Sequence, residues 1–585
     1  QLGAGRLLLG GIVETPQELV INASLLSVPE GSARATASVA GRPDSLGVLI
    51  DRLTSELLAR EAGEAVQRVP GLTNTSLPAL RAYLQGQAAY RRGRYDEAAD
   101  WFDRALEQDS SFALAALGLV AAGVWEGPET FIPAFHIASR LRERLNSRDQ
   151  VLVSAFAGPD YPAPYPFAEQ IARWERAAEV LRDSPETWYQ LGDVLFHRSP
   201  MIGAGWSLRR AAAAFHRAIE LDSTFAAPLD HLVEIAVVTA DTAEVRRLGN
   251  LYLARYPEAE LADFVRWRVA VVLGGDSARA QLRSRFNRMN IRSLTRIVAF
   301  AELSGIGLED MEPASAALRQ KARVRTGDPE GAHWVLADLA LNQGRPSEAR
   351  GAVEALREVE MPRHDAEWGH ILNALLEEGD STAAANAVRL LRNATAGPAA
   401  RNPADRAQRN VDLCILGVWY AQRTEWSDAQ RALAQLREPG VEEQVFPAWP
   451  PGKVCAAVLE AFEAVVRGRA DAGIALARAD SLVREGWIAT MFMNLILAQL
   501  WETQGDLSRA LAAVRRRQYD DPDGPAHLAT GLRMEGRLAA LAGDRDGAMR
   551  AYAHYLALVN RPEPRVQPLV AQAREELGRL VAAER

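Results

Sequence analysis

Four side chains of the kinds that bind metal ions lie close together near the middle of the chain. His364, Asp365, Glu367 and His370 combine imidazoles with carboxylates, which are donor groups that zinc accepts. On a helix Glu367 and His370 share a face, because residues three apart are neighbours there. The alternative is a solvated surface cluster, since charged side chains mostly face water. We favour the solvated interpretation, so the sequence predicts no metal ion and no other cofactor.

Glycines that could bring the backbone close to a ligand occur in two places. Gly3, Gly5 and Gly10 have the wrong spacing for a dinucleotide loop and lie before or within an expected strand. Gly203 and Gly205 precede Trp206, where the simpler interpretation is an inserted loop that needs flexible turns. The sequence contains no phosphate-binding loop, Gly-x-Ser-x-Gly elbow, His-Glu-x2-His or Cys-x2-Cys motif. We therefore expect no catalytic residues in this chain.

Length and composition favour an array of helices. The 585 residues exceed what one hydrophobic core supports, and 48% apolar with 24% charged residues suits helical segments. The net charge of -8 includes no basic stripe, so no nucleic-acid partner is predicted. The apolar runs 112–124 and 488–501 are shorter than the roughly 20 residues that cross a bilayer, so we predict no membrane span.

The two cysteines, Cys414 and Cys455, are far apart, and each lies in an apolar helical stretch. We do not expect them to form a disulfide bond, and they leave the cellular compartment open.

The first 62 residues are predicted to form a small α+β segment. Apolar or alternating runs at 6–13, 19–28 and 33–39 are separated by turn residues, which predicts a three-stranded meander. A helix is expected to open at Pro43 and to cover the sheet with an apolar face that includes Leu49 and Leu53.

This segment resembles the second half of a TolB-like amino-terminal domain over about 60 residues. The residues that carry the resemblance are Leu2-Gly3-Ala4, Gly10, the run 23–26, Gly31, Asp51, Leu53 and Leu57. In bacteria such domains precede tetratricopeptide repeats in proteins linked to serine/threonine kinases or adenylate cyclases. The resemblance implies that the chain is trimmed at Gln1 and that a longer polypeptide, with a possible membrane tether, extends upstream.

Paired helices are predicted from about residue 78 onward. Residues 79–112 resemble the tetratricopeptide repeat, with small residues where two helices approach and an aromatic residue between hairpins. The matching residues are Gly86, Gly93, Tyr95, Ala98, Phe102 and Ala105. A second repeat has Gly192 in its first helix and Phe215 in its second, with about seven extra residues between them near 199–206.

Later repeats keep less of this signature. They are marked by Gly344 and Ala349; Gly417, Tyr420, Trp426 and Ala429; Gly468 and Gly473; Gly505 and Ala510; and Gly536, Gly543, Ala548 and Tyr552. The glycines at 344, 505 and 543 are expected to adopt the left-handed conformation that ends the first helix. Residues 225–325 are helical by period and are interpreted as drifted repeats, and a more polar helix at 564–583 should cap the array.

The predicted fold is therefore mainly α, an α-solenoid of tetratricopeptide-like hairpins preceded by a small α+β segment. The expected divisions are residues 1–62, the partial TolB-like segment; 63–157, a first sub-array; 158–325, a second sub-array with drifted repeats; 326–445, a third; and 446–585, the carboxy-terminal repeats and capping helix. Prolines and aromatics interrupt the array at 158–167 and 446–452, as linkers between sub-arrays or as gates over the groove.

The resemblance implies that fixed positions on the first helix of each hairpin face the concave surface. These positions hold Tyr83, Gln87, Tyr90, Arg91, Tyr189, Asp193, Phe196, His197, Trp334, Asp338, Asn342, Arg533 and Arg537. Alternating aromatic and polar side chains suit a groove that holds a peptide. The alternative is that several of them pack between neighbouring hairpins.

We expect a non-enzymatic scaffold that binds protein or peptide partners on its concave face. One alternative is the sensory region of a bacterial receptor-type kinase or related signalling protein, which would lie outside the cytoplasm or at the membrane. Another is a structural subunit of a larger assembly. The sequence alone leaves a cytoplasmic location open.

Overall fold

The computed structural model divides the chain into two compact units. The amino-terminal unit comprises Gln1–Pro159 with Thr224–Ala227, and the carboxy-terminal unit comprises Asp160–Ser223 with Pro228–Arg585. The structure describes residues 5–15, 17–28, 30–158, 167–200, 207–322, 329–355, 364–376, 381–397, 403–438, 451–484, 490–517 and 527–582. Most of the proline-rich segments 158–167 and 446–452, and the insertion around Gly203 and Gly205, lie outside these residues. Their roles as linkers or gates stay predictions, as do the finer sub-array divisions.

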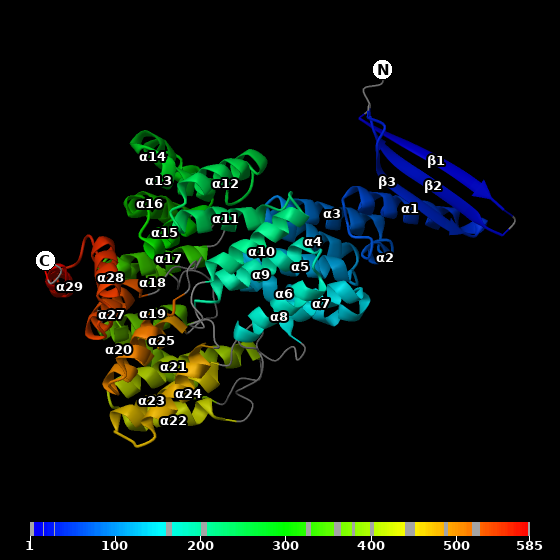
Figure 1. The fold of residues 1–585 in the computed structure, drawn as a ribbon. Coiled ribbons are helices and arrows are strands. Elements are labelled where there is room, and N and C mark those ends of the chain that lie inside the picture. The colour runs from blue at the N-terminus through cyan, green and yellow to red at the C-terminus, as the bar shows by residue number, and fades with distance from the viewer. Residues whose placement is uncertain are drawn as a thin grey trace. The chain divides into compact units, whose positions relative to one another are not determined.

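The amino-terminal unit begins with an antiparallel sheet in the order β1-β2-β3, as predicted. Its strands are β1 (Arg6–Glu14), β2 (Leu19–Ser27) and β3 (Ala33–Gly41), followed by the short η1 (Pro43–Ser45) and by α1 (Leu46–Glu61). In Figure 1, α1 runs along the sheet. Leu49 and Leu53 of α1 pack on Leu19, Ile21 and Val39 of the sheet, which confirms the predicted covering helix.

Helices make up the rest of the amino-terminal unit. They are α2 (Val69–Leu72), α3 (Leu77–Arg91), α4 (Tyr95–Gln108), α5 (Ala113–Glu126), α6 (Pro128–Arg140), η2 (Arg142–Arg144) and α7 (Ser147–Ala157).

The carboxy-terminal unit is helical throughout its described part, including the region predicted as drifted repeats. Its elements are α8 (Phe167–Val180), α9 (Pro185–His197), α10 (Leu208–Leu221), α11 (Ala226–Val238), α12 (Thr242–Arg255), α13 (Ala262–Leu273), α14 (Asp276–Arg283), η3 (Phe286–Arg288), α15 (Ile291–Ser304), η4 (Leu308–Asp310), α16 (Met311–Ala322), α17 (Pro329–Asn342), α18 (Pro346–Ala355), α19 (Asp365–Leu376), α20 (Ser381–Thr395), α21 (Pro403–Gln422), α22 (Trp426–Leu436), α23 (Pro451–Val466), α24 (Ala472–Arg484), α25 (Thr490–Thr503), α26 (Leu507–Val514), α27 (Leu528–Leu541), α28 (Arg545–Leu558) and α29 (Gln567–Ala582).

A glycine facing an aromatic ring joins the two helices of a hairpin in three places. A Cβ atom on Gly86 of α3 would lie 2.8 Å from the ring of Phe102 on α4, and one on Gly536 of α27 would lie 2.8 Å from Tyr552 on α28. Both pairs are 16 residues apart in the chain. In α9 and α10, Gly192 faces Phe215, and the two are 23 residues apart in the chain, which agrees with an insertion of about seven residues. The predicted role of the small and aromatic residues is therefore confirmed.

A left-handed residue ends the first helix of several hairpins. The φ angles of Gly344, Gly505 and Gly543 are 76°, 78° and 80°, as the sequence predicted. Ala240 and Thr424 adopt the same conformation without being glycine, with φ angles of 55° and 59°. At each of these five turns the N–H of the next residue donates a hydrogen bond to the carbonyl five positions before it. The same hydrogen bond therefore closes the turn whether or not the left-handed residue is glycine.

Cys414 on α21 and Cys455 on α23 form a disulfide bond, with a Cα–Cα distance of 5.3 Å. The prediction that they stay apart was wrong. The two cysteines are 41 residues apart in the chain, but α21 and α23 pack against each other. This packing brings the two sulfur atoms together.

None of the helices in the described ranges is long and apolar enough to cross a membrane.

We expect Gly536→Ala to lower stability, because its methyl group would press on the Tyr552 ring. Overpacking of this kind costs about 1 to 3 kcal/mol. Gly578→Ala in α29 is the matched control, since no atom lies within 4 Å of a Cβ there. The measurement is the midpoint of denaturant unfolding. Equal midpoints for the two variants would contradict the role given to the glycine–aromatic contact.

Candidate functional site

The predicted binding residues of α3 divide into buried and accessible ones. Tyr83 is fully buried, with its ring 5.8 Å from that of Phe102. Tyr90 is also buried, whereas Gln87 and Arg91 are partly exposed. Gln87 Nε2 donates to Tyr83 Oη at 3.0 Å, so the accessible amide is held by the buried phenol.

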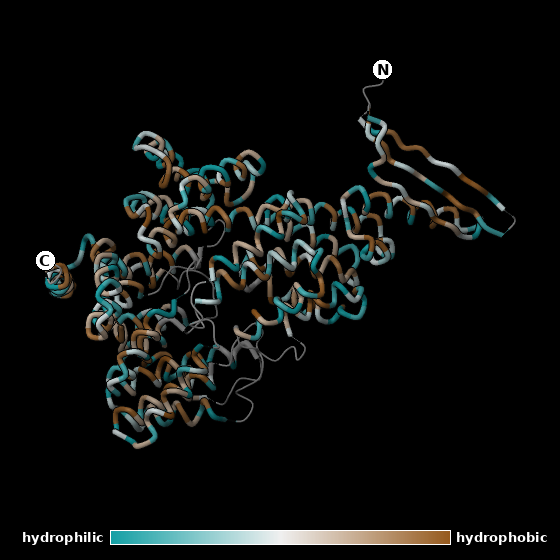
Figure 2. The backbone as a smooth tube through the Cα atoms, viewed as in Figure 1, coloured by the Kyte–Doolittle hydropathy of each residue, from teal (hydrophilic) through white to brown (hydrophobic). Residues whose placement is uncertain are grey.

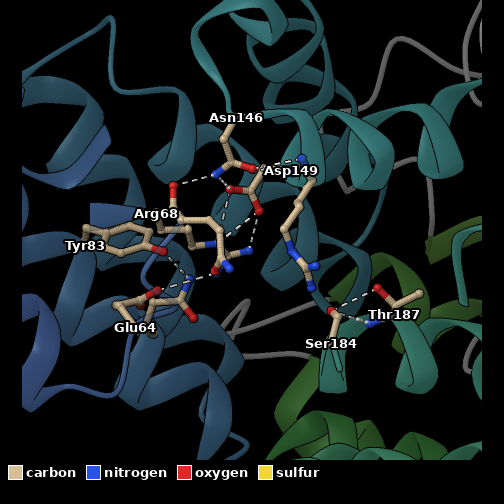
Figure 3. Close-up of polar contacts among 10 residues, drawn as sticks. Glu64, Arg68, Tyr83, Asn146, Asp149, Ser184 and Thr187 are labelled. Atoms are coloured by element: carbon tan, nitrogen blue, oxygen red, sulfur yellow. Dashed lines mark hydrogen bonds and ion pairs between the residues drawn. The ribbon is translucent and has the colours of Figure 1, made fainter. Parts of the chain in front are cut away.

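A buried ion pair lies in the same unit as Tyr83 and ties α2 to α7 (Figure 3). Arg68 donates through Nη2 and Nε to Asp149 Oδ1, at 2.8 and 3.0 Å. Asn146 donates to Asp149 Oδ2 at 2.6 Å and also caps α7. Burial by itself would lower the pKa of Arg68, but the carboxylates of Asp149 and Glu64 and the phenol of Tyr83 together outweigh it and hold that pKa well above its usual range. This network is structural, because its charges are satisfied inside the unit.

Helix α9 presents the same division between buried and accessible positions. Its start is capped by Ser184, whose Oγ accepts from the N–H of Thr187 at 3.3 Å (Figure 3). Tyr189 and Phe196 are buried, whereas Asp193 and His197 are partly exposed.

Asp193 and His197 meet a third residue, His231 of α11, which the sequence did not single out. The Nε2 atoms of His197 and His231 are 3.2 Å apart. Asp193 Oδ1 lies 3.6 Å from each of these nitrogens. The signal available in the sequence was Asp193 one helical turn before His197, but the insertion before α10 hid which residue of the next hairpin would face them.

Asn342 of α17 is fully buried and joins three helices. Its Nδ2 donates to Glu302 Oε1 of α15 at 2.9 Å, and its Oδ1 accepts from the N–H of Ala529 in α27 at 3.0 Å. Asp338 on the same helix is buried as well, and Trp334 is partly exposed. Asn342, one of the predicted third set of binding residues, thus contacts a helix nearly 190 residues away in the chain.

Helix α27 carries the last predicted pair, Arg533 and Arg537, both partly exposed. Arg537 Nη2 donates to Glu502 Oε2 of α25 at 2.6 Å, and this hydrogen bond raises the pKa of Arg537 despite partial burial.

Six of the residues predicted to line the concave surface are buried. Tyr83, Tyr90, Tyr189, Phe196, Asp338 and Asn342 pack inside the structure. A buried side chain offers a partner no surface, so the packing alternative holds for these six in this structure. Partner binding through the partly exposed Gln87, Arg91, Asp193, His197, Trp334, Arg533 and Arg537 stays a prediction.

The histidines of the 364–370 cluster point to different carboxylates. His364 Nδ1 lies 2.9 Å from Asp412 Oδ2 of α21, and His370 Nε2 lies 2.7 Å from Glu354 Oε1 of α18. Glu367 is buried, and the side chain of Asp365 lies outside the described residues. The two imidazoles therefore serve contacts between helices rather than one shared centre.

An open cleft of about 540 Å³ lies on α8, α9 and α10. Trp188 is held on its wall by a hydrogen bond from its Nε1 to the carbonyl of Arg182, at 3.0 Å. The lining residues are Glu175, Ala178, Glu179, Arg182, Trp188, Leu191, Arg210 and Arg217. An indole beside three guanidinium groups suits an aromatic or acidic side chain of a partner.

Comparison with protein families finds a tetratricopeptide repeat at residues 79–112, the hairpin of α3 and α4. Residues 79–112 therefore form a tetratricopeptide repeat, and the described part of the chain continues as further helical hairpins. No curated protein matches it.

Several solved structures are similar over most of the chain. They include the APC/C hetero-tetramer Cut9–Hcn1, with 15% identity, a TM-score of 0.33 and coverage of 86% of this chain and 84% of that one. Yeast Tom70 has 13% identity, a TM-score of 0.24 and coverage of 86% and 96%. Naa15/Naa10 bound to HypK-THB has 12% identity, a TM-score of 0.21 and coverage of 85% and 65%.

We expect stability to depend on pH through Glu302. Burial raises the pKa of its carboxyl to about 8, although the hydrogen bond from Asn342 opposes the shift. The folded protein therefore holds a proton that the unfolded chain, with a pKa near 4.5, releases. This contribution to stability is complete below pH 4.5 and is lost as the pH rises through 8.

Glu302→Gln keeps the acceptor for Asn342 and has no charge, so it should flatten this pH dependence. At pH 8 we expect it to stabilise the protein by up to about 4 kcal/mol. Unfolding midpoints measured from pH 4.5 to 8 test the effect, with the exposed Glu220→Gln as control. An unchanged slope in Glu302→Gln would show that the carboxyl is ionised in the folded protein.

Proposed function

We propose that this chain is a non-enzymatic scaffold that binds protein or peptide partners. The observation that carries the proposal is the Trp188 cleft on the α9–α10 hairpin, whose Gly192–Phe215 contact repeats the Gly86–Phe102 contact of the matched repeat at 79–112. Helical repeats of this type expose long surfaces whose chemistry is set by single side chains while the packing residues stay the same. The cleft offers what a binding hot spot needs, namely an aromatic wall with charged groups around it.

The charges around the cleft indicate which partner segment it suits. Arg210 forms an ion pair with Glu175. Arg182 donates a hydrogen bond from Nε to the backbone carbonyl of Glu179. Arg217 pairs with Glu220 at 3.0 Å, so the charges around the cleft are nearly balanced and the indole favours a segment with an aromatic residue flanked by polar groups.

Trp188→Ala should reduce partner binding by about tenfold or more, the loss typical of an aromatic hot spot. Partners are captured on the immobilised full chain, identified by mass spectrometry and titrated against each variant. Trp101→Ala on α4 is the matched control, since Trp101 is also partly exposed and stacks under Arg104. Equal affinity for the wild type and Trp188→Ala would refute binding at this cleft.

A second candidate function rests on strand β1. Leu8 and Ile12 face the same side of the sheet as the buried Ala23 and Ile21, yet they are 61% and 65% exposed. Leu7, Leu9 and Val13 make the other face apolar too, and Figure 2 shows this hydrophobic stretch along β1. A strand with two apolar faces is typical of the inside of a larger sheet. This supports a sheet that further strands complete, as the resemblance to a TolB-like domain implies, and such a domain would belong to the regulatory region of a bacterial signalling protein.

The disulfide between Cys414 and Cys455 supports an extracytoplasmic location for that regulatory region. Disulfides persist in oxidising compartments and are rare in the cytosol, where thiols are kept reduced.

The second candidate predicts that the gene encodes further strands upstream of Gln1, and beyond them an apolar segment of about 20 residues and a catalytic domain. Sequencing the gene upstream tests whether these strands, the apolar segment and the catalytic domain are encoded there. Alkylation of Cys414 and Cys455 in protein taken directly from the native cell decides the compartment. Upstream sequence without strands or a catalytic domain, or free thiols at both cysteines, would exclude this candidate.

A further inference from the structure

We propose that Asp193, His197 and His231 form a binding site for a zinc-like divalent transition-metal ion, with a fourth coordination position open to solvent. The proposal is independent of partner binding at the Trp188 cleft. It rests on the spacing of three donor atoms that come from α9 and α11.

The three donor atoms are spaced like three corners of a zinc tetrahedron. With zinc–nitrogen and zinc–oxygen bonds of about 2.0 to 2.2 Å, neighbouring ligand atoms lie about 3.3 to 3.6 Å apart. The two Nε2 atoms are 3.2 Å apart, and each lies 3.6 Å from Asp193 Oδ1. One ion placed between them would be within bonding distance of all three.

The two histidines share a hydrogen bond between their Nε2 atoms at 3.2 Å, and a bound ion would replace it. The separation of 3.6 Å between Asp193 Oδ1 and each of these nitrogens is longer than a usual hydrogen bond. It is the expected distance between two atoms that share a metal ion.

The surrounding helices hold the two imidazoles in place before any ion arrives. Asp193 and His197 are one turn apart on α9, so the helix itself sets their spacing. The ring of His231 packs 4.8 Å from that of Phe215 and 5.5 Å from that of Phe196. Such packing fixes the orientation of a ligand, as the outer residues of metal sites do.

Charge near the site favours a cation. Asp230 and Glu234 flank His231 on α11, and Arg268 of α13 pairs with both. Together with Asp193 this places carboxylates from both α9 and α11 near the two imidazoles, and carboxylates favour a bound cation. Two imidazoles and one carboxylate select zinc-like ions over calcium or magnesium, which prefer oxygen donors.

His231 is almost fully buried, but Asp193 and His197 keep 21% and 15% of their side chains exposed. The side of the site that faces solvent is therefore the side on which a fourth ligand would enter. Three protein ligands with one open position is the arrangement of zinc sites that keep a bound water.

The test is isothermal titration of the full chain, freed of metal by a chelator, with zinc chloride. One zinc ion per chain is expected in the wild type. His197→Ala should weaken binding at least tenfold to a hundredfold, because even residues behind the ligands have effects of that size. Asp193→Asn should weaken it too. His216→Ala on α10 is the control, since His216 is exposed and lies outside the cluster.

Circular dichroism verifies that each variant is folded, and His197 is chosen over the buried His231 for that reason. Cobalt(II) provides a second readout, since a tetrahedral site gives intense visible absorption bands that should vanish in His197→Ala. Absence of zinc binding in the wild type, or equal binding by the wild type and both ligand variants, would overturn the proposal.

Discussion

The contact between a glycine on one helix and an aromatic ring on the next is the constraint on which the hairpins depend. Gly86 with Phe102, Gly192 with Phe215 and Gly536 with Tyr552 let two helices approach until a ring fills the space between them. Phe102 also faces Gly118 of α5, so one ring joins a hairpin to its successor. Because a single hairpin cannot bury its apolar face alone, this repeated contact builds the array.

Burial of the first helices changes where recognition can occur. The aromatic residues predicted to line a groove, such as Tyr83 and Tyr189, fill the space between hairpins instead. Asn342 binds Glu302 and the start of α27, so hairpins far apart in the chain contact each other inside the carboxy-terminal unit. The proposed recognition would therefore use residues such as Trp188, which lie beside the packed positions.

The hairpin of α9 and α10 combines several of these features. Its insertion leaves the Gly192–Phe215 contact intact, while Asp193 and His197 on the same helix meet His231 of the next hairpin. The Trp188 cleft and the proposed metal site thus share helix α9. Gly192, which packs against Phe215, lies between Trp188 and Asp193 in the chain. A repeat can keep its packing residues and still gain chemistry at neighbouring positions.

The sequence by itself determined the local structure. Helical period, turn glycines and the spacing of small and aromatic residues predicted the hairpins, the left-handed turns and the covered sheet, because each depends on residues close together in the chain. The tertiary structure alone decided the Cys414–Cys455 bond, the burial of Asn342 and the meeting of Asp193 and His197 with His231. Each of these contacts joins different helices. Which residues face each other there depends on the rotation between successive hairpins and on loop length, and neither produces a periodic pattern in the sequence.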